Sequence, residues 1–347
     1  MSVDDARRVI ERAAAARVFP AAAVEVGSSS DVLWTEAFGT LTFDAAASMT
    51  SIDTPFDLAS LTKVISTTST LMELTRTGAL DLDERVSACF AEWRGRDRDH
   101  VTIRHLLEHA SGLPARLIDA PPIGRREFEH EICVMPLEYA PASASVYSDL
   151  GFILLGFLAC DRGSAPLTEL FLRIAGTNLT FGLAAGNRKR AAPTRPMDDD
   201  GRRGRLLQGE VHDNYAAALG GVAGHAGLFG SAPAVGLFAR TVLRAARGGT
   251  DQPAPFVPAL VKAFTARGSV TASSRALGWD TMLPTSSCGQ RMTQAAFGHV
   301  GFTGTSLWID PLRDRYFVLL TNRACGGGTL DEIRAVRRDF HDALGDL

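Results

Sequence analysis

One serine and the lysine three residues after it could do chemistry together. Ser60 and Lys63 stand in the run Asp57-Leu58-Ala59-Ser60-Leu61-Thr62-Lys63, and Lys63 is one of only three lysines among 36 basic residues. Residues three apart share a helix face, so the amine and the hydroxyl come within hydrogen-bond reach. A lysine amine can lose its proton and act as a base, which an arginine guanidinium cannot do. The pair predicts a serine nucleophile activated by lysine, but so short a motif recurs by chance and needs partners.

Two further segments offer those partners. Tyr147-Ser148-Asp149 precedes an apolar stretch with a helical pattern, and its phenol could relay a proton. His299-Val300-Gly301-Phe302 lies on a predicted strand, where the glycine lets a substrate approach the backbone closely. A helix that begins at Ser60 would also favour the oxyanion formed on attack, because its N-terminal end is positive.

The elements that must position these segments fall into an α+β order. Periodicity and turn residues predict helices over 4–16, 58–75, 101–109, 149–159 and 330–344, strands over 21–26, 32–38, 277–282, 295–300, 305–309 and 316–321, and a loop over 186–209. Strands at both ends with helices between them predict one sheet built from both termini and an inserted, mainly helical lobe. We therefore expect a discontinuous α/β sheet subdomain, 1–78 and 266–347, and a mainly helical subdomain, 79–265.

The motifs, taken in order, resemble those of a known superfamily. Phe56-Asp57-Leu58-Ala59-Ser60-Leu61-Thr62-Lys63 resembles its nucleophile segment, and Leu106-Leu107-Glu108-His109-Ala110-Ser111-Gly112-Leu113-Pro114 resembles its helix-ending Ser-Gly-Leu turn. Tyr147-Ser148-Asp149 stands where the family has Tyr-x-Asn, and Gly224-His225-Ala226-Gly227-Leu228-Phe229 resembles a later glycine-rich segment. The family is the serine hydrolase superfamily of class C β-lactamases, penicillin-binding DD-peptidases, D-aminopeptidases and β-lactamase-like esterases.

The resemblance implies a fold and a set of roles. The fold would be β-lactamase/transpeptidase-like, with an antiparallel sheet flanked by helices. Ser60 would form an acyl-enzyme, Lys63 would activate it, and Tyr147 would act as acid and base. The backbone N–H groups of Ser60 and Phe302 would form the oxyanion hole, with no metal or organic cofactor. To act as a base, Lys63 would need a pKa lowered towards neutrality by burial and nearby positive charge.

Substrate binding is expected to involve Asp149, His299, Gly301 and His225, and two of these depart from the family pattern. His299 stands where the lactamase members have the lysine of Lys-Thr-Gly, so a carboxylate anchor is weakened. Asp149 replaces asparagine and cannot donate to an acylamide carbonyl, although it could pair with Lys63. Both changes favour an esterase, D-aminopeptidase or DD-peptidase-like hydrolase of a small ester or amide, with weak or no β-lactamase activity.

Two alternatives stay open from the sequence. His105-Leu106-Leu107-Glu108-His109 matches the inverted zinc-peptidase motif, with two histidines one helical turn apart. A non-catalytic ligand-binding protein on the same scaffold is the other alternative, because His299 and Asp149 alter the site.

Composition excludes several other classes. The chain has 347 residues, 46% hydrophobic and 22% charged, with a net charge of −3, as is typical of a globular protein without a nucleic-acid partner. The most apolar stretch, residues 151–160, is about half the length that a bilayer requires. Five widely spaced cysteines predict reduced thiols, and no basic start precedes an apolar run, so we expect a cytoplasmic protein with a small-molecule partner. The sequence does not predict the oligomeric state.

Overall fold

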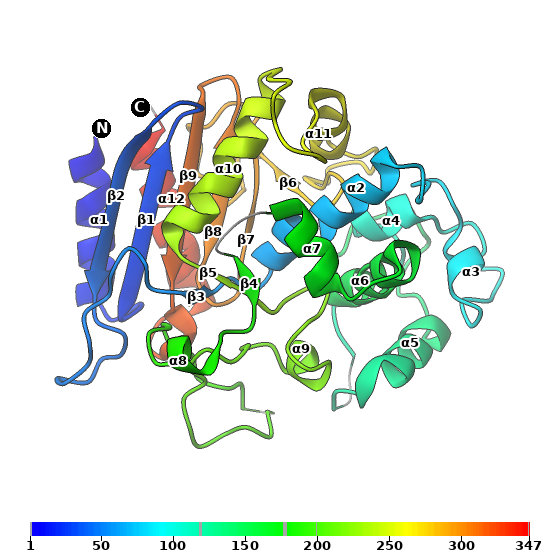
Figure 1. Ribbon diagram of the computed structural model, residues 1–347, viewed down its shortest axis with the longest axis horizontal. Helices are drawn as coiled ribbons and strands as arrows, with labels where there is room; N and C mark the ends of the chain where they lie inside the picture. Colours follow the sequence, from blue (N-terminus) through cyan, green and yellow to red (C-terminus); the bar gives the residue numbers. More distant parts are fainter. Residues whose placement is uncertain (1, 118–119, 176–178, 199, 346) are drawn as a thin grey trace.

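A six-stranded antiparallel sheet forms the frame of the protein (Figure 1). The computed structural model describes residues 2–117, 120–175, 179–198, 200–345 and 347. The strands run in the order β2-β1-β9-β8-β7-β6. Their bounds are β1 Ala21–Gly27, β2 Val32–Gly39, β6 Asp280–Thr281, β7 Phe297–Val300, β8 Ser306–Asp310 and β9 Arg315–Thr321. The first two strands and the last four come from opposite ends of the chain, which confirms the predicted fold.

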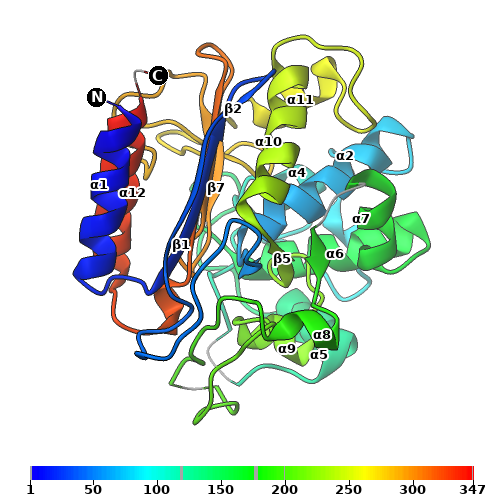
Figure 2. The same cartoon turned by 60° about the vertical axis from the view of Figure 1, so that its left-hand side comes forward.

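Helices cover both faces of this sheet. The terminal helices α1 (Val3–Ala15) and α12 (Leu330–Leu344) lie on one face and α10 (Ala232–Ala246) on the other (Figure 2). Successive strand side chains point to opposite faces, so Leu319 packs with the terminal helices and Leu320 with the α10 side. Central strands are therefore apolar on both faces, which explains why β1 is buried throughout.

The remaining helices pack beside the sheet as a second region. They are α2 Ser69–Arg76, α3 Val86–Cys89, α4 Ile103–Leu107, α5 Gly124–Val134, α6 Asp149–Gly163, α7 Leu167–Ala175, α8 Ala185–Arg188, α9 Asn214–Ala218 and α11 Pro258–Thr265. A small sheet in the order β3-β5-β4 joins this region to the nucleophile segment. Its strands are β3 Phe56–Asp57, β4 Thr180–Phe181 and β5 Leu228–Gly230. The sequence did not predict this sheet, because strands of two or three residues carry too little pattern.

Several predicted elements differ in extent from those observed. The helix expected over 58–75 begins at residue 61, and its first turns are a π-helix, η1 (Lys63–Thr68). The strand expected over 277–282 is reduced to β6. Helix α10 lies against the sheet although it belongs to the segment 79–265. The proposed subdomain division stays a prediction.

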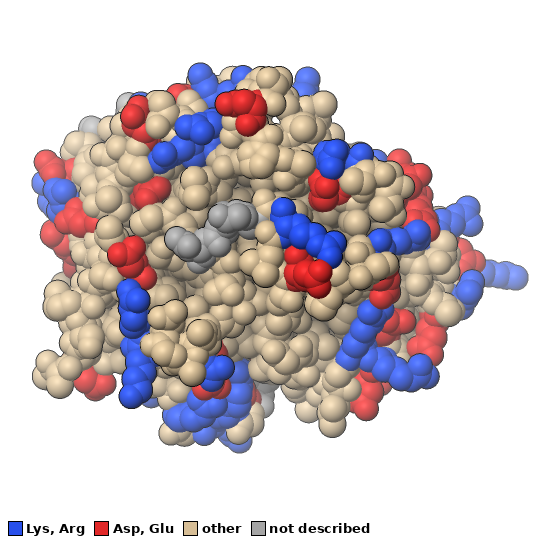
Figure 3. All heavy atoms as spheres, in the orientation of Figure 1, with Lys and Arg blue, Asp and Glu red and all other residues tan. Residues whose placement is uncertain are grey.

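On the face seen in Figure 3, positive and negative side chains are intermixed. Within the described residues no single helix has the length and apolar composition to cross a bilayer, although the bent pair Asp149–Gly163 and Leu167–Ile174 passes on length and composition alone. All five cysteines are free thiols, and three of them are buried.

Candidate active site

Ser60 lies in a tight turn between β3 and the helix that begins at residue 61. The buried carboxylate of Asp57 fastens this turn, because it accepts hydrogen bonds from the N–H groups of Ala59 (2.8 Å) and His212 (2.6 Å). Ala59 has a φ of 47°, a left-handed conformation that alanine adopts only where the surroundings hold it. The turn presents Ser60 to a cleft of about 470 Å³.

Lys63 is fully buried, and its ammonium group finds three acceptors. Nζ donates to Ser60 Oγ (3.0 Å), to Asp149 Oδ1 (2.7 Å) and to the carbonyl of His225 (3.1 Å). Burial lowers the pKa of Lys63, but the charges of Asp149 and Tyr147 and hydrogen bonds with the same two residues together outweigh burial, so the net pKa is raised. The predicted lowering of the Lys63 pKa is therefore wrong, because the carboxylate that replaces the family's asparagine pairs directly with the ammonium group.

Tyr147 reaches the same point from the loop before α6. Its ring centroid lies 4.9 Å from Lys63 Nζ and 5.7 Å from the ring centroid of His299. Burial raises the pKa of the phenol, while Lys63 and the hydrogen bond with Ser60 oppose that rise. Near neutral pH the phenol and the ammonium both hold their protons, so attack by Ser60 requires that this group of side chains first give one up.

Two backbone N–H groups are free to stabilise an oxyanion. Among the described residues, neither the N–H of Ser60 nor that of Phe302 has a hydrogen-bond partner. Phe302 lies in the turn between β7 and β8, and two threonines of that turn bind the nucleophile segment. Thr303 Oγ1 donates to the carbonyl of Asp57 (2.8 Å) and Thr305 Oγ1 to that of Leu58 (3.0 Å). The predicted oxyanion donors therefore belong to two turns that are fastened together.

Gly301 has a packing role beside the one predicted. The sequence predicts a close approach of a substrate to the backbone at this glycine, which stays a prediction. In the structure, a Cβ at this position would overlap Thr305 Oγ1 and lie 2.7 Å from the carbonyl oxygen of Leu58. Gly301 lines the cleft, but it is the nucleophile turn of the same chain that approaches it.

His299 lines the cleft as a neutral imidazole. Burial, followed by the charge of Arg275, lowers its pKa well below the ordinary value. Its Nδ1 lies 2.8 Å from the carbonyl of Val300 and donates to it, so Nε2 carries no proton and can only accept. Nε2 is buried and has no partner within the described residues. A buried, neutral acceptor therefore stands where the lactamase members have a cation.

Asp149 and His225 belong to a network that surrounds Lys63. Arg116 Nη1 donates to Asp149 Oδ2 (3.0 Å) and to Asp213 Oδ2 (2.9 Å), and His225 Nε2 lies 2.7 Å from Asp213 Oδ1. Both Asp149 oxygens are therefore bound by cations of the chain, and the suggested Lys63 pair is present. Both residues line the cleft, while their predicted contact with substrate stays a prediction.

The zinc alternative has no geometric basis. Helix α4 ends at Leu107, and His109 follows it with a φ of 55°, so the two histidines do not share a helix face. His105 Nδ1 accepts from the N–H of Thr102, and His109 Nδ1 accepts from that of Ser148, both at 3.0 Å. Across the residues that the structure describes, no group of three or more His, Cys, Asp or Glu side chains is placed to hold a metal ion.

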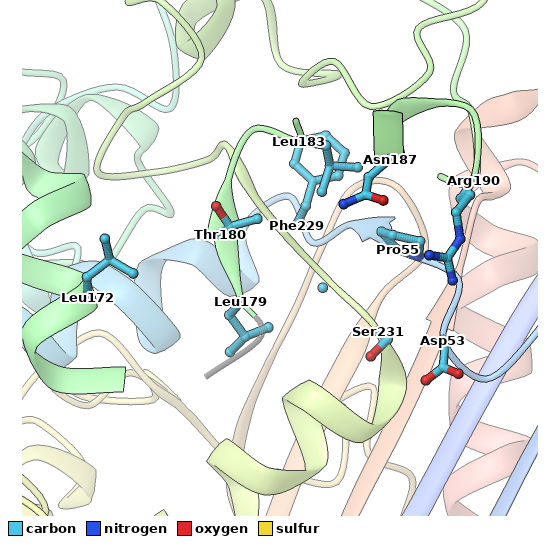
Figure 4. A pocket seen from close by; sticks show the side chains of 11 residues that line it. Asp53, Pro55, Leu172, Leu179, Thr180, Leu183, Asn187, Arg190, Phe229 and Ser231 are labelled. Atoms are coloured by element: carbon cyan, nitrogen blue, oxygen red, sulfur yellow. The ribbon is translucent and has the colours of Figure 1, made fainter. Parts of the chain in front are cut away.

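A second pocket, of about 410 Å³, lies beside the small sheet (Figure 4). Leu172, Leu179 and Phe229 supply apolar wall, and Ser231 is the only serine among its described lining residues. Those described residues include no lysine, histidine or tyrosine, and their one carboxylate is Asp53. Ser231 therefore lacks the lysine and tyrosine partners that Ser60 has in its cleft.

Residues 6–340 match the model of the family described as Beta-lactamase. The match covers nearly the whole chain, so the protein belongs to the Beta-lactamase family and is a serine hydrolase. The resemblance inferred from the motifs is confirmed.

Two curated relatives and one solved structure show how far this likeness extends. The chain is 33% identical over 304 residues to N-acetylmuramyl-L-alanine amidase of Bacillus subtilis (strain 168), and the aligned region covers 78% of this chain and 68% of the relative. It is 30% identical over 305 residues to an Escherichia coli (strain K12) protein named as a D-alanyl-D-alanine carboxypeptidase, which covers 78% and 69%. A class C β-lactamase from Rhodobacter sphaeroides shares the fold, with a TM-score of 0.77 and 18% identity over 98% of this chain and 99% of that one.

Sequence reasoning missed several residues that shape the cleft. Asp57 was quoted only as part of a motif, and Arg116, Arg275 and Arg337 were not singled out. All three arginines line the cleft. With 33 arginines in the chain, none of them stood out by rarity as Lys63 did.

Proposed function

We propose that the protein hydrolyses a small amide or ester through an acyl-enzyme formed on Ser60. The observation that carries this proposal is the convergence of Ser60, Lys63 and Tyr147 on one cleft beside two unpartnered N–H groups. An acyl-transfer site needs a nucleophile, a proton carrier and oxyanion donors, and these groups are of those kinds.

The charges of the cleft favour a substrate that carries a carboxylate. Arg116 is occupied by Asp149 and Asp213, but Arg275 lies 4.0 Å from its acidic neighbour, Asp280, at the limit of an ion pair. The Arg275 guanidinium carbon lies 5.0 Å from the ring centroid of Tyr147, so a cation stands close to the candidate acid and base. The sequence predicts a weakened carboxylate anchor because His299 replaces a lysine, and Arg275 is another candidate to bind a substrate carboxylate.

Efficient β-lactamase activity is not part of the proposal. His299 is neutral and offers an acceptor where the lactamase members have an ammonium group, and Asp149 is bound to Lys63 and Arg116. The two curated relatives are named as an amidase and a D-alanyl-D-alanine carboxypeptidase, which supports amides and peptides as the first substrates to test. A cytoplasmic location stays a prediction for cell fractionation to test.

Labelling tests the nucleophile directly. A fluorophosphonate should add one equivalent to the wild-type protein by intact mass and none to Ser60→Ala, and the added mass should map to the peptide that holds Ser60. Ser231→Ala serves as the matched control and should label like the wild type. An unlabelled wild type would favour the ligand-binding alternative, and label on another residue would contradict the assignment of Ser60.

A substrate panel tests the reaction class. We expect turnover of p-nitrophenyl acetate and of short acylated D-alanyl-D-alanine peptides, and little turnover of a chromogenic cephalosporin. A peptide with a free C-terminal carboxylate should react faster than its C-terminal amide, and Arg275→Gln should reduce that preference. Equal rates for the two peptides would refute the carboxylate preference and leave the assignment of Ser60 intact.

A further inference from the structure

Arg337 belongs to helix α12, which covers the face of the sheet opposite α10, and among the described residues it is a buried cation without an acidic partner. Its side chain is almost fully buried at 4% exposure, and it lines the same cleft as Ser60. No carboxylate among the described residues forms an ion pair with it, and its Nε has no hydrogen-bond partner there. Burying an unpaired charge is costly, so a guanidinium at this place calls for a function.

The contacts that Arg337 does make lead to the predicted oxyanion hole. Its Nη2 donates to the carbonyl oxygens of Gly301 (2.7 Å) and Thr305 (3.0 Å). The Gly301 carbonyl and the Phe302 N–H belong to one peptide group, which is trans. In a trans peptide the two groups point in opposite directions, so a cation on the oxygen side leaves the N–H side facing away from it.

We propose that Arg337 is a positioning residue of the oxyanion hole, which polarises the Gly301–Phe302 peptide and orients its N–H towards the oxyanion. A hydrogen bond from a charged donor draws electron density to the Gly301 oxygen and makes the Phe302 N–H a stronger donor. This inference rests on the proposed acyl transfer at Ser60, and it assigns to α12 a part that the predicted site residues do not include.

The surroundings of Arg337 reinforce the effect. Burial, and then the charges of Arg323 and Arg334, lower its pKa to about 9, so it is a cation at neutral pH. Arg323 Nη2 also donates to the carbonyl of Phe302, the next peptide of the same turn. Two guanidinium groups therefore bind consecutive carbonyls behind the predicted hole, in a buried setting where charge acts strongly.

Exchanging the charge at position 337 tests the proposal. We expect Arg337→Gln to lower kcat for p-nitrophenyl acetate about tenfold with KM within about twofold, because the interaction grows as the oxyanion forms. The dissociation constant of phenylboronic acid, whose tetrahedral adduct with a serine mimics the oxyanion, should rise by the same factor as kcat falls. Arg337→Lys should keep most of kcat, and Arg338→Gln, on the exposed side of α12, is the matched control that should change neither.

Three results would overturn the inference. Wild-type kcat in a folded Arg337→Gln variant would do so, and so would a rise in KM alone. If the Gln variant does not fold, Arg337→Lys decides, because a folded Lys variant with kcat more than about tenfold down would show that retained charge does not support the hole. Failure of the proposed function is distinguishable, since it would appear as an unlabelled Ser60 in the wild type.

Discussion

Replacing Asp149 by asparagine should move the pH dependence of the enzyme towards lower pH. Asp149 Oδ1 lies 2.7 Å from Lys63 Nζ, and its charge is the largest of the contributions that oppose burial and raise the pKa of that lysine. Asparagine has the same shape, can still accept from Nζ, and leaves Arg116 its contacts with Asp213 and Asn214. The variant therefore removes the charge while it preserves the packing.

The size of the effect follows from the distance between the charges. An opposite charge within hydrogen-bond reach commonly changes a pKa by about one to three units, and each unit corresponds to about 1.4 kcal/mol between the two protonation states. Where one group must lose a proton before reaction, the rate at a pH below its pKa changes tenfold for each unit by which that pKa moves. At pH 7, acylation by p-nitrophenyl acetate should therefore become about tenfold to a thousandfold faster in Asp149→Asn.

The assay is the burst rate of p-nitrophenol release between pH 5 and 10, with circular dichroism to confirm the fold. Asp213→Asn is the control, because it removes a carboxylate of the same network that does not contact Lys63. The pH dependence of the burst rate should move less in Asp213→Asn than in Asp149→Asn. An unchanged pH dependence in folded Asp149→Asn, or one displaced to higher pH, would refute the conclusion that Asp149 holds the proton on Lys63.

Two further variants test the turns that carry the site. Gly301→Ala should lower the free energy of unfolding by about 1–3 kcal/mol and abolish Ser60 labelling, because the new Cβ would overlap Thr305 Oγ1. Gly186→Ala is the control and should do neither, because a Cβ at that position meets nothing within 4 Å. Burial raises the pKa of Asp57 from 3.8 to about 6, so the stability it contributes is full below pH 3.8 and is lost as the pH rises through 6. Relative to Asp57→Asn, the wild type should lose about 2 kcal/mol of unfolding free energy between pH 4 and 7 in urea titrations, and a constant difference would contradict this burial effect.

The sequence predicted what depends on local pattern and on motif order. The sheet from both termini, the helices at 4–16 and 330–344, and the meeting of Ser60, Lys63 and Tyr147 followed from periodicity and from the resemblance. The π-helical start at Lys63 could not be predicted, because it depends on how the buried helix packs. The position of α10 on the sheet and the Arg337 contact lay equally beyond it, since both join segments far apart in the chain.

The raised pKa of Lys63 affects each proton transfer in which that residue takes part. With Lys63 protonated, Lys63 and Arg116 balance Asp149 and Asp213, so these four side chains carry no net charge, and loss of the lysine proton leaves the four with a net negative charge. A raised pKa makes the Lys63 ammonium slow to give up its proton, whether to leave a free base or to protonate a leaving group. The leaving amine of an amide needs a proton whereas p-nitrophenolate does not, so Asp149 opposes two proton transfers in amide cleavage and one in cleavage of the activated ester. We therefore expect Asp149→Asn to accelerate both the activated ester and an acylated D-alanine amide at pH 7. Slowing of the amide in a folded variant would show instead that Asp149 assists departure of the amine.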